Sequence, residues 1–290
     1  MAEFLLASVN GVTSGSIVFL VAAGLTLVFG IGGVLNFAHG GVFAISAYVM
    51  YTLSSHLGAN WWAFAASTLV AIAVAAALGG AAELLFVRRF YPLRHEYMLL
   101  GTYALLLILD GALQLIWGTE PKSSPAPRGL RGTVDLGPIQ VTTLSLFIIL
   151  IALLALAGLY YWLQRTSFGH LAKAAAHDRD AAMTVGVNVP FVLTGVFIVG
   201  SMLAGVAGAV LAPNQALHPE LGNLFIIQAF VAVVLGGLGS VAGAWIAAVI
   251  LGLADSLWFT YLPDVPQIGV FVVLVAILVI KPTGLIGSKA

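Results

Sequence analysis

The amino-acid sequence contains no Asp, Glu, Lys or Arg between Glu3 and Glu83, and a second charge-free run separates Glu220 from Asp255. Because about 20 residues of helix cross the hydrocarbon core of a bilayer, apolar runs of this length predict membrane spans. Only 8% of all residues are charged, whereas soluble domains carry about 25%. A soluble alternative would be a very apolar core wrapped by other subunits. We therefore predict an integral membrane protein.

Polar interruptions divide the chain into eight or nine predicted spans. These lie near 8–30, 33–53, 61–87, 98–117, 141–163, 191–212, 224–239, 241–262 and 266–281. Backbone polar groups in lipid must be satisfied internally, so spanning segments are helices or the strands of a closed barrel. Barrel strands alternate apolar and polar residues, and these segments do not alternate. The prediction is an all-α polytopic bundle, with one transmembrane permease-like domain over residues 1–290.

The distribution of Lys and Arg predicts the orientation, because cytoplasmic loops accumulate positive charge. With nine spans, eight basic residues fall on one side, in loops 88–97 and 164–190 and in the tail at Lys281 and Lys289. The opposite side has three, all in loop 118–140. This loop is rich in Pro and Gly and is predicted to be irregular. The N-terminus is therefore expected outside and the C-terminus inside.

Composition and motifs argue against several chemistries. The formal net charge is zero, which gives no reason to expect nucleic-acid binding. The chain has no cysteine, so it has no disulfide, thiolate metal site or cysteine nucleophile. The phosphate-binding motif Gly-x-x-x-x-Gly-Lys-Ser/Thr is absent, and the six histidines have no metal-ligand spacing within a helix. We expect no catalytic residue, metal site or cofactor in this chain; if ATP drives it, another chain hydrolyses the ATP.

Two glycine-rich segments, Phe29–Asn36 and Leu235–Ser240, interrupt long apolar runs. Paired Gly-interrupted helices in two halves of a chain are the best sequence indication of a transporter's midplane site. Glycine allows a helix to unwind, and the freed backbone groups then face a cavity instead of lipid.

Polar residues within the spans are further candidates, because such residues usually face the bundle interior or a water-filled path. Neutral side chains suit a path that a zwitterion must leave again. The predicted pathway residues are Asn36, His39, Gly40, Gln228, Gly236 and Gly237. A purely structural role is the alternative for Asn36 and His39. Asp110 and Asp255 lie near span ends, where a partly solvated position is expected. Glu83, Arg88 and Arg89 close the third span on the inner side and are expected to anchor it.

The cytoplasmic loop 164–190 predicts two short helices. The first covers about 168–176, and the second begins after Asp178 as N-cap, has Asp180 in its first turn and stops at Gly186. A solvated loop with small helices would have the same pattern. The functional interpretation is a docking element for a cytoplasmic partner.

The residues Asp180-Ala181-Ala182 with Gly186 resemble the Glu-Ala-Ala-x-x-x-Gly loop of ATP-binding-cassette (ABC) importer permeases. In those permeases the loop forms a coupling helix that sits in a groove of the ATPase subunit. The surrounding run 165–188 is similar to that of the branched-chain amino acid (high-affinity amino acid transport) permeases. Three further regions fit the same family in the same order: 24–40, 234–244 and 281–285. The short N-terminal region resembles the shorter of the family's two permeases.

This resemblance implies a non-enzymatic permease subunit of an ABC importer in the bacterial inner membrane, moving a small polar solute, in the first place Leu, Ile or Val. It also implies a second homologous permease, a periplasmic substrate-binding protein and two cytoplasmic ATPases, which would hold ATP and Mg. The residues implied in ATPase coupling are Asp178, Asp180, Ala181, Ala182 and Gly186.

Two alternatives stay open. The family commonly has an acid after Asn-Phe-Ala-His-Gly, and Gly41 stands there in this chain. Urea or a short amide is therefore an alternative cargo. An ion-coupled secondary transporter is the second alternative. It would need a titratable group deep in the bundle, and the charge-free run 4–82 supplies no carboxylate there.

Overall fold

A computed structural model of the chain describes residues 1–265, 269–281 and 284–286, and it is mostly helical. The long helices are α1 (Ala2–Gly32), α2 (Ala38–Leu57), α3 (Trp61–Leu85), α4 (His95–Trp117), α5 (Thr143–Arg165), α8 (Val189–Leu211), α9 (Leu221–Gly236), α10 (Val241–Tyr261) and α11 (Gly269–Ile280). The shorter elements are η1 (Val87–Phe90), η2 (Arg128–Leu130), β1 (Thr133–Leu136), β2 (Ile139–Thr142), α6 (Ser167–His177) and α7 (Arg179–Thr184). Each predicted span contains one long helix. The start of the ninth span (266–268), Pro282 and Thr283 of the last matching region, and Lys289 lie outside the described residues.

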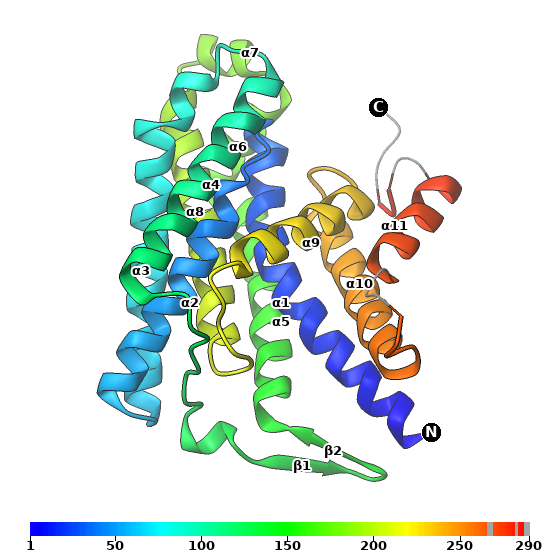
Figure 1. The fold of residues 1–290 in the computed structure, drawn as a ribbon. Coiled ribbons are helices and arrows are strands. Elements are labelled where there is room, and N and C mark those ends of the chain that lie inside the picture. Colours follow the sequence, from blue (N-terminus) through cyan, green and yellow to red (C-terminus); the bar gives the residue numbers. More distant parts are fainter. Residues whose placement is uncertain (266–268, 282–283, 287–290) are drawn as a thin grey trace.

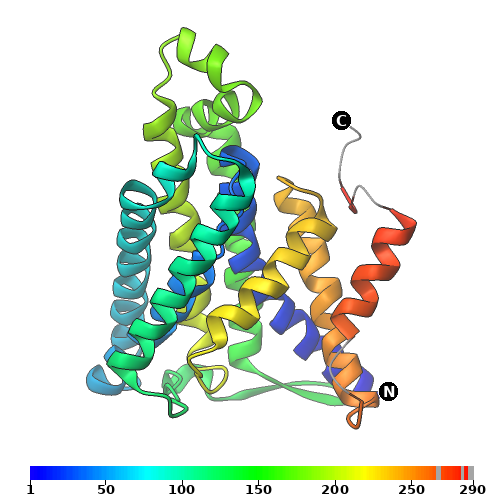
Figure 2. The same cartoon turned by 45° about the horizontal axis from the view of Figure 1, so that its top comes forward.

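Helix α1 lies at the centre of the molecule, between a bundle of α2, α3, α4 and α8 and a second group of α9, α10 and α11 (Figures 1 and 2). Every residue from Gly15 to Val28 is buried. A helix that is apolar on all sides has no face suited to water or a polar boundary, so it is expected inside a bundle. Helices α8, α9, α10 and α5 pack around it.

Small residues set the crossing of α1 and α10. A Cβ atom added at Gly11 would lie 2.8 Å from the carbonyl oxygen of Gly252, and one at Gly15 would lie 2.6 Å from that of Ala248. Hydrophobic burial gives no driving force between helices in lipid, so close van der Waals packing of this kind holds them together.

Six of the described helices are long and apolar enough to cross a membrane, judged by length and composition. They are α1, α3 with its continuation to Phe90, α4, α5, α8 and α10. Helices α9 and α11 are apolar but shorter. The chain is therefore a multi-pass membrane protein, and the exact number of spans stays a prediction.

The loop predicted to be irregular, 118–140, contains regular structure, so the all-α prediction is wrong in this part. Strands β1 and β2 form an antiparallel hairpin in which Leu136 pairs with Ile139. Gly137 has φ 70° and occupies the first turn position, where two-residue hairpin turns favour glycine. The hairpin lies at the end of the molecule opposite α7 (Figure 1).

Glu83, predicted to anchor the third span at the membrane surface, is instead fully buried. Its carboxylate accepts hydrogen bonds from Arg88 Nε (3.1 Å) and Nη2 (3.1 Å), Tyr91 Oη (3.2 Å) and Thr194 Oγ1 (2.7 Å). Burial and the neighbouring Glu83 raise the pKa of Tyr91 well above its usual range, so the hydroxyl keeps the proton it donates. This network joins the end of α3 to the start of α8.

Candidate coupling surface and translocation path

The segment 164–190 forms the two predicted helices, α6 and α7. Thr166 Oγ1 caps α6 by accepting a hydrogen bond from the backbone N–H of Gly169 (3.0 Å). Asp178 Oδ1 caps α7 by accepting one from Ala181 (2.9 Å). After α7 the chain turns at Gly186, whose φ is 87°. The predicted cap at Asp178 and the stop at Gly186 are therefore confirmed.

Helix α7 presents an exposed surface at one end of the molecule (Figure 1). Asp178, Asp180, Ala181 and Gly186 are exposed, whereas Ala182 is buried. Two apolar side chains beside them are also exposed, Met183 (50%) and Val185 (79%). Their exposure could not be predicted from the sequence, because six residues are too few for a periodic pattern to show which side of the helix faces outward.

Arg179, also missed, points the other way. Its Nη2 donates a hydrogen bond to the carbonyl oxygen of Gly32, the last residue of α1. Beyond it, Gly33 adopts φ 61° and its N–H bonds the carbonyl of Phe29 (2.8 Å), which ends the helix. No local pattern connects two residues 147 positions apart, so only the fold could place them together.

The first glycine-rich segment is a real break, because residues 33–37 separate α1 from α2. Asn36 (4% exposed) and His39 (1%) are buried beside it. Asn36 Oδ1 has no hydrogen-bond partner among the described residues, and the His39 ring lies beside the backbone of Val21 in α1. His39 packs between α1 and α8, since a Cβ atom added at Gly24 would lie 2.6 Å from its Nε2 and 2.5 Å from the carbonyl oxygen of Gly200.

The predicted pathway glycines lie at helix contacts and helix ends. A Cβ atom added at Gly40 would lie 2.4 Å from the carbonyl oxygen of Gly222 in α9. One at Gly236 would lie 2.4 Å from the backbone nitrogen of Ala244 in α10. Gly237, with φ 99°, ends α9. In this conformation Gly40 and Gly236 allow the backbones of neighbouring helices to approach closely, and they do not line an open path.

The two glycine-rich segments touch each other. A Cβ atom added at Gly30 would lie 2.9 Å from Cα of Gly239, which has φ 84°. Both residues line a cavity of about 540 Å³ between α1, α5, α6 and the start of α10. Lys173 also lines it, and its Nζ donates to Gln164 Oε1 (2.6 Å). The sequence indicated the two breaks separately and gave no sign of their contact.

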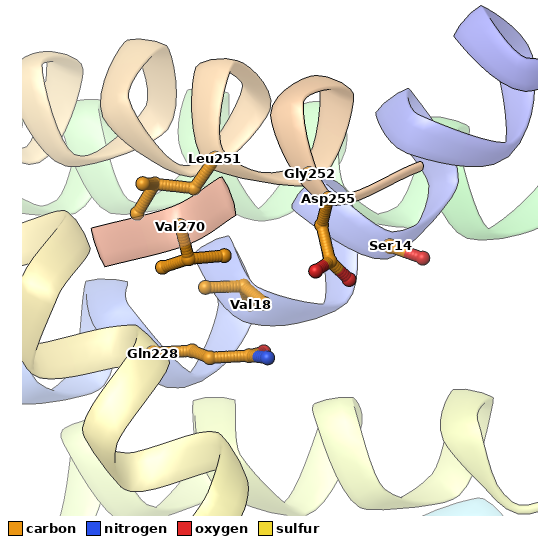
Figure 3. Close-up of a pocket in the computed structure, with 7 residues that line it drawn as sticks. All are labelled: Ser14, Val18, Gln228, Leu251, Gly252, Asp255 and Val270. Carbon is orange, nitrogen blue, oxygen red and sulfur yellow. The ribbon is translucent and has the colours of Figure 1, made fainter. Parts of the chain in front are cut away.

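Gln228 lies in a second pocket, between α1, α9, α10 and α11. Its amide and the carboxylate of Asp255 point into the same space (Figure 3). The remaining lining residues are Ser14, Val18, Leu251, Gly252 and Val270. An adjoining cavity of about 190 Å³ shares Gln228, Asp255 and Val270. The pocket between Gln228 and Asp255 has a volume of about 20 Å³, which is room for a water molecule and not for an amino acid in this conformation.

Asp110 is more buried than predicted, at 7% exposure. Asn223 Nδ2 donates a hydrogen bond to its Oδ2, so it joins α4 to α9 instead of facing the membrane surface. No group of three or more His, Asp or Glu side chains able to hold a metal ion occurs in the part of the chain that the structure describes.

Comparison with known proteins gives the family. Residues 7–281 match the family described as branched-chain amino acid transport system / permease component. The chain belongs to this family. The permease is 31% identical to the high-affinity branched-chain amino acid transport system permease protein LivH of Escherichia coli K12, over 98% of this chain and 96% of that protein. It is 30% identical to BraD of Pseudomonas aeruginosa, over 96% and 94%. The xylose transport system permease protein XylH of Escherichia coli K12 matches 46% of this permease and 35% of its own length, at 32% identity.

The permease departs from the expected motif at Gly41, and the structure shows what occupies the space. A Cβ atom added there would lie 2.8 Å from Cδ1 and 2.9 Å from Cβ of Leu109 in α4. An acidic side chain would have to displace that leucine. Glycine at this position therefore accompanies a close, apolar contact between α2 and α4.

Proposed function

We propose that this permease is the membrane-spanning subunit of an ABC importer for branched-chain amino acids. The observation that carries the proposal is α7, a capped helix whose Asp178, Asp180 and Ala181 are exposed at one end of the bundle. The relatives similar over nearly its whole length are named as branched-chain amino acid permeases. The xylose permease matches less than half of the chain.

The proposed topology has nine spans, with the N-terminus outside and the C-terminus inside. The end of the bundle that carries α7 also carries loop 88–97, since Arg88 Nη2 reaches the Pro190 carbonyl oxygen at 3.5 Å. Cytoplasmic loops accumulate positive charge, which supports placing this end inside. The hairpin would then face the periplasm, and the membrane would be the bacterial inner membrane.

The proposed partners are a second homologous permease, two cytoplasmic ATPases and a periplasmic substrate-binding protein. Binding and hydrolysis of ATP with Mg would occur on the ATPases. Closure of the ATPase pair would move α7 and switch the bundle between inward- and outward-facing states. Exposed Asp180, Met183 and Val185 would contact the ATPase, Gly186 would permit the turn that follows, and buried Ala182 would seat α7 on the permease.

Of the polar residues proposed for the translocation path, Gln228 lines a pocket, whereas Asn36 and His39 are buried. Gln228 faces a pocket in this conformation. Asn36 and His39 are both buried, and Asn36 Oδ1 lacks a partner among the described residues; an unmade buried hydrogen bond is costly. Both side chains would gain partners, solute or water, when the bundle opens beside them.

The test is uptake and assembly in the full complex. The permease, co-expressed with its partners and reconstituted in liposomes, should accumulate leucine only with ATP inside. Asp180→Lys and Gly186→Trp should reduce both ATPase retention and uptake. Asp135→Lys, the same charge change on the exposed hairpin at the other end, is the matched control. Uptake that follows an ion gradient without ATP would reject the proposal, as would unchanged ATPase retention in both variants.

A further inference from the structure

Arg179 joins the surface proposed for the ATPase to the inner end of the central helix. It is the first residue of α7, and it lies half-buried between exposed neighbours on either side, Asp178 and Asp180. Its guanidinium reaches across the loop to the carbonyl oxygen of Gly32 at the end of α1. One short element therefore has an outward side for docking and an inward side that holds α1.

The contact fits the chemistry of both partners. The last carbonyl groups of a helix have no partner within the helix, and together they carry a partial negative charge. A guanidinium supplies several donors and a charge that does not titrate. The space beside Gly33 admits the guanidinium without crowding. A Cβ atom added at Gly33 would lie 3.8 Å from Arg179 Nη2, which is an ordinary contact distance. Hydrogen bonds to a charged donor are stronger than neutral ones.

The same end of α1 contacts the second glycine-rich segment. Gly30, two residues before Gly32, lies against Gly239 in the turn between α9 and α10. That turn is itself held, because Leu285 and Ile286 donate backbone hydrogen bonds to Leu235 (2.7 Å) and Gly236 (3.1 Å). A displacement of the α1 end must therefore move this turn or break its contact.

We propose that Arg179 is a positioning residue that transmits movement of α7 to the Gly30–Gly239 contact. The proposal rests on the ABC importer function proposed above. When the ATPase moves α7, the guanidinium draws the α1 end with it, and the contact between the two breaks opens or closes. Because Gly30 and Gly239 line the 540 Å³ cavity, the opening of that cavity follows the position of α7.

The experiment compares coupling, not only transport. Complexes carrying Arg179→Ala, Arg179→Lys or Arg89→Ala are reconstituted in liposomes, and ATPase retention, ATP hydrolysis and leucine uptake are measured on the same vesicles. Arg89 is an exposed arginine in η1, at the same end of the bundle, and is the matched control. We expect Arg179→Ala to keep the ATPase and hydrolyse ATP, with leucine moved per ATP lower by about tenfold, the scale of one charge-assisted hydrogen bond. Lysine should restore part of the ratio, and Arg89→Ala should leave it unchanged.

Three results would overturn the assignment. An unchanged ratio in Arg179→Ala would show that the contact transmits nothing. Loss of the ATPase from that complex would assign Arg179 to docking, and an equal fall in Arg89→Ala would indicate a general charge effect. If Arg179→Ala does not accumulate in the membrane, the ratio for Arg179→Lys and Arg179→Gln decides by the same criterion. Failure of the unaltered complex to couple uptake to ATP would instead reject the proposed function.

Discussion

Removing the Glu83 carboxylate should destabilise the permease more than any change at its surface. Glu83→Ala deletes the acceptor of four hydrogen bonds and leaves the Arg88 guanidinium without its ion-pair partner. Removing one member of a buried ion pair costs about 3–5 kcal/mol. The Arg88 side chain is 38% exposed, so water can hydrate part of the abandoned charge. We therefore expect a loss near the lower end, about 3 kcal/mol of unfolding free energy.

The structure also predicts how this loss of unfolding free energy divides among the groups that bond to Glu83. Glu83→Gln keeps the shape and one acceptor oxygen, so it should cost less, about 1–2 kcal/mol. Replacing both Glu83 and Arg88 by leucine removes the orphaned charge together with its partner, and should recover part of the loss. Thr194→Val removes the hydroxyl that donates to Glu83 Oε2 and accepts from Arg88 Nη2, and should cost about 1–2 kcal/mol.

Equilibrium unfolding in mixed micelles with increasing dodecyl sulfate, followed by tryptophan fluorescence, measures these differences. A double-mutant cycle with Glu83→Ala and Arg88→Ala should give a coupling free energy above about 1 kcal/mol, because contacting residues in one network do not behave additively. Arg89→Ala, outside the network, is the control. Additive losses in the cycle would refute the reasoning. A loss below about 0.5 kcal/mol for Glu83→Ala would refute it too, because that is the range of ordinary surface substitutions.

Three further predictions test the close contacts. Gly11→Leu should lower the yield of monodisperse protein, because the side chain forces α1 away from α10 at a cost of about 1–3 kcal/mol. Gly111→Leu should not lower the yield, since nothing lies within 4 Å of a Cβ atom added there; equal yields would contradict this. Gly30→Ala should reduce leucine uptake more than Gly111→Ala, because an added Cβ would lie 2.9 Å from Cα of Gly239 at the first position and has nothing within 4 Å at the second; equal uptake would remove the role of the Gly30 contact. Cysteines at Asn36 and His39 should react with aqueous thiol reagents during ATP turnover and be protected without ATP, and cysteines that never react would exclude both from the path.

The sequence predicted the helices well because apolar run length is a local property. The charge-free run 4–82 predicted three spans, and α1, α2 and α3 occupy it. The hairpin in 118–140 was missed, although Thr133–Leu136 and Ile139–Thr142 flank a Gly-Pro pair that could form a tight turn. Four-residue strands give too short an alternation to outweigh the Pro and Gly content of the loop, so the composition favoured irregular structure.

The candidate site was predicted unevenly for a physical reason. Caps and stops depend on neighbouring residues, so Asp178 and Gly186 could be placed from the sequence. Burial depends on which helices meet. Asp110 lies in the second half of α4 and its partner Asn223 comes from α9. No local pattern indicates that pairing. For the same reason the sequence predicted Glu83 at the surface, where the fold surrounds it with donors.

The position of the two glycine breaks now suggests why glycine is needed in both. A Cβ atom at Gly30 would lie 2.9 Å from Cα of Gly239, so a side chain there would push the end of α1 away from the turn after α9. Gly239 is needed for a different reason, because its φ of 84° is a backbone conformation that other residues rarely adopt. Arg179 holds that same end of α1 from the other side, through Gly32. Small residues allow the contact to form, and the arginine decides where it forms relative to α7. A contact that is backbone against backbone has no side chains to unpack, so it can open and close with little rearrangement, which is what a coupled movement at this end of the bundle requires.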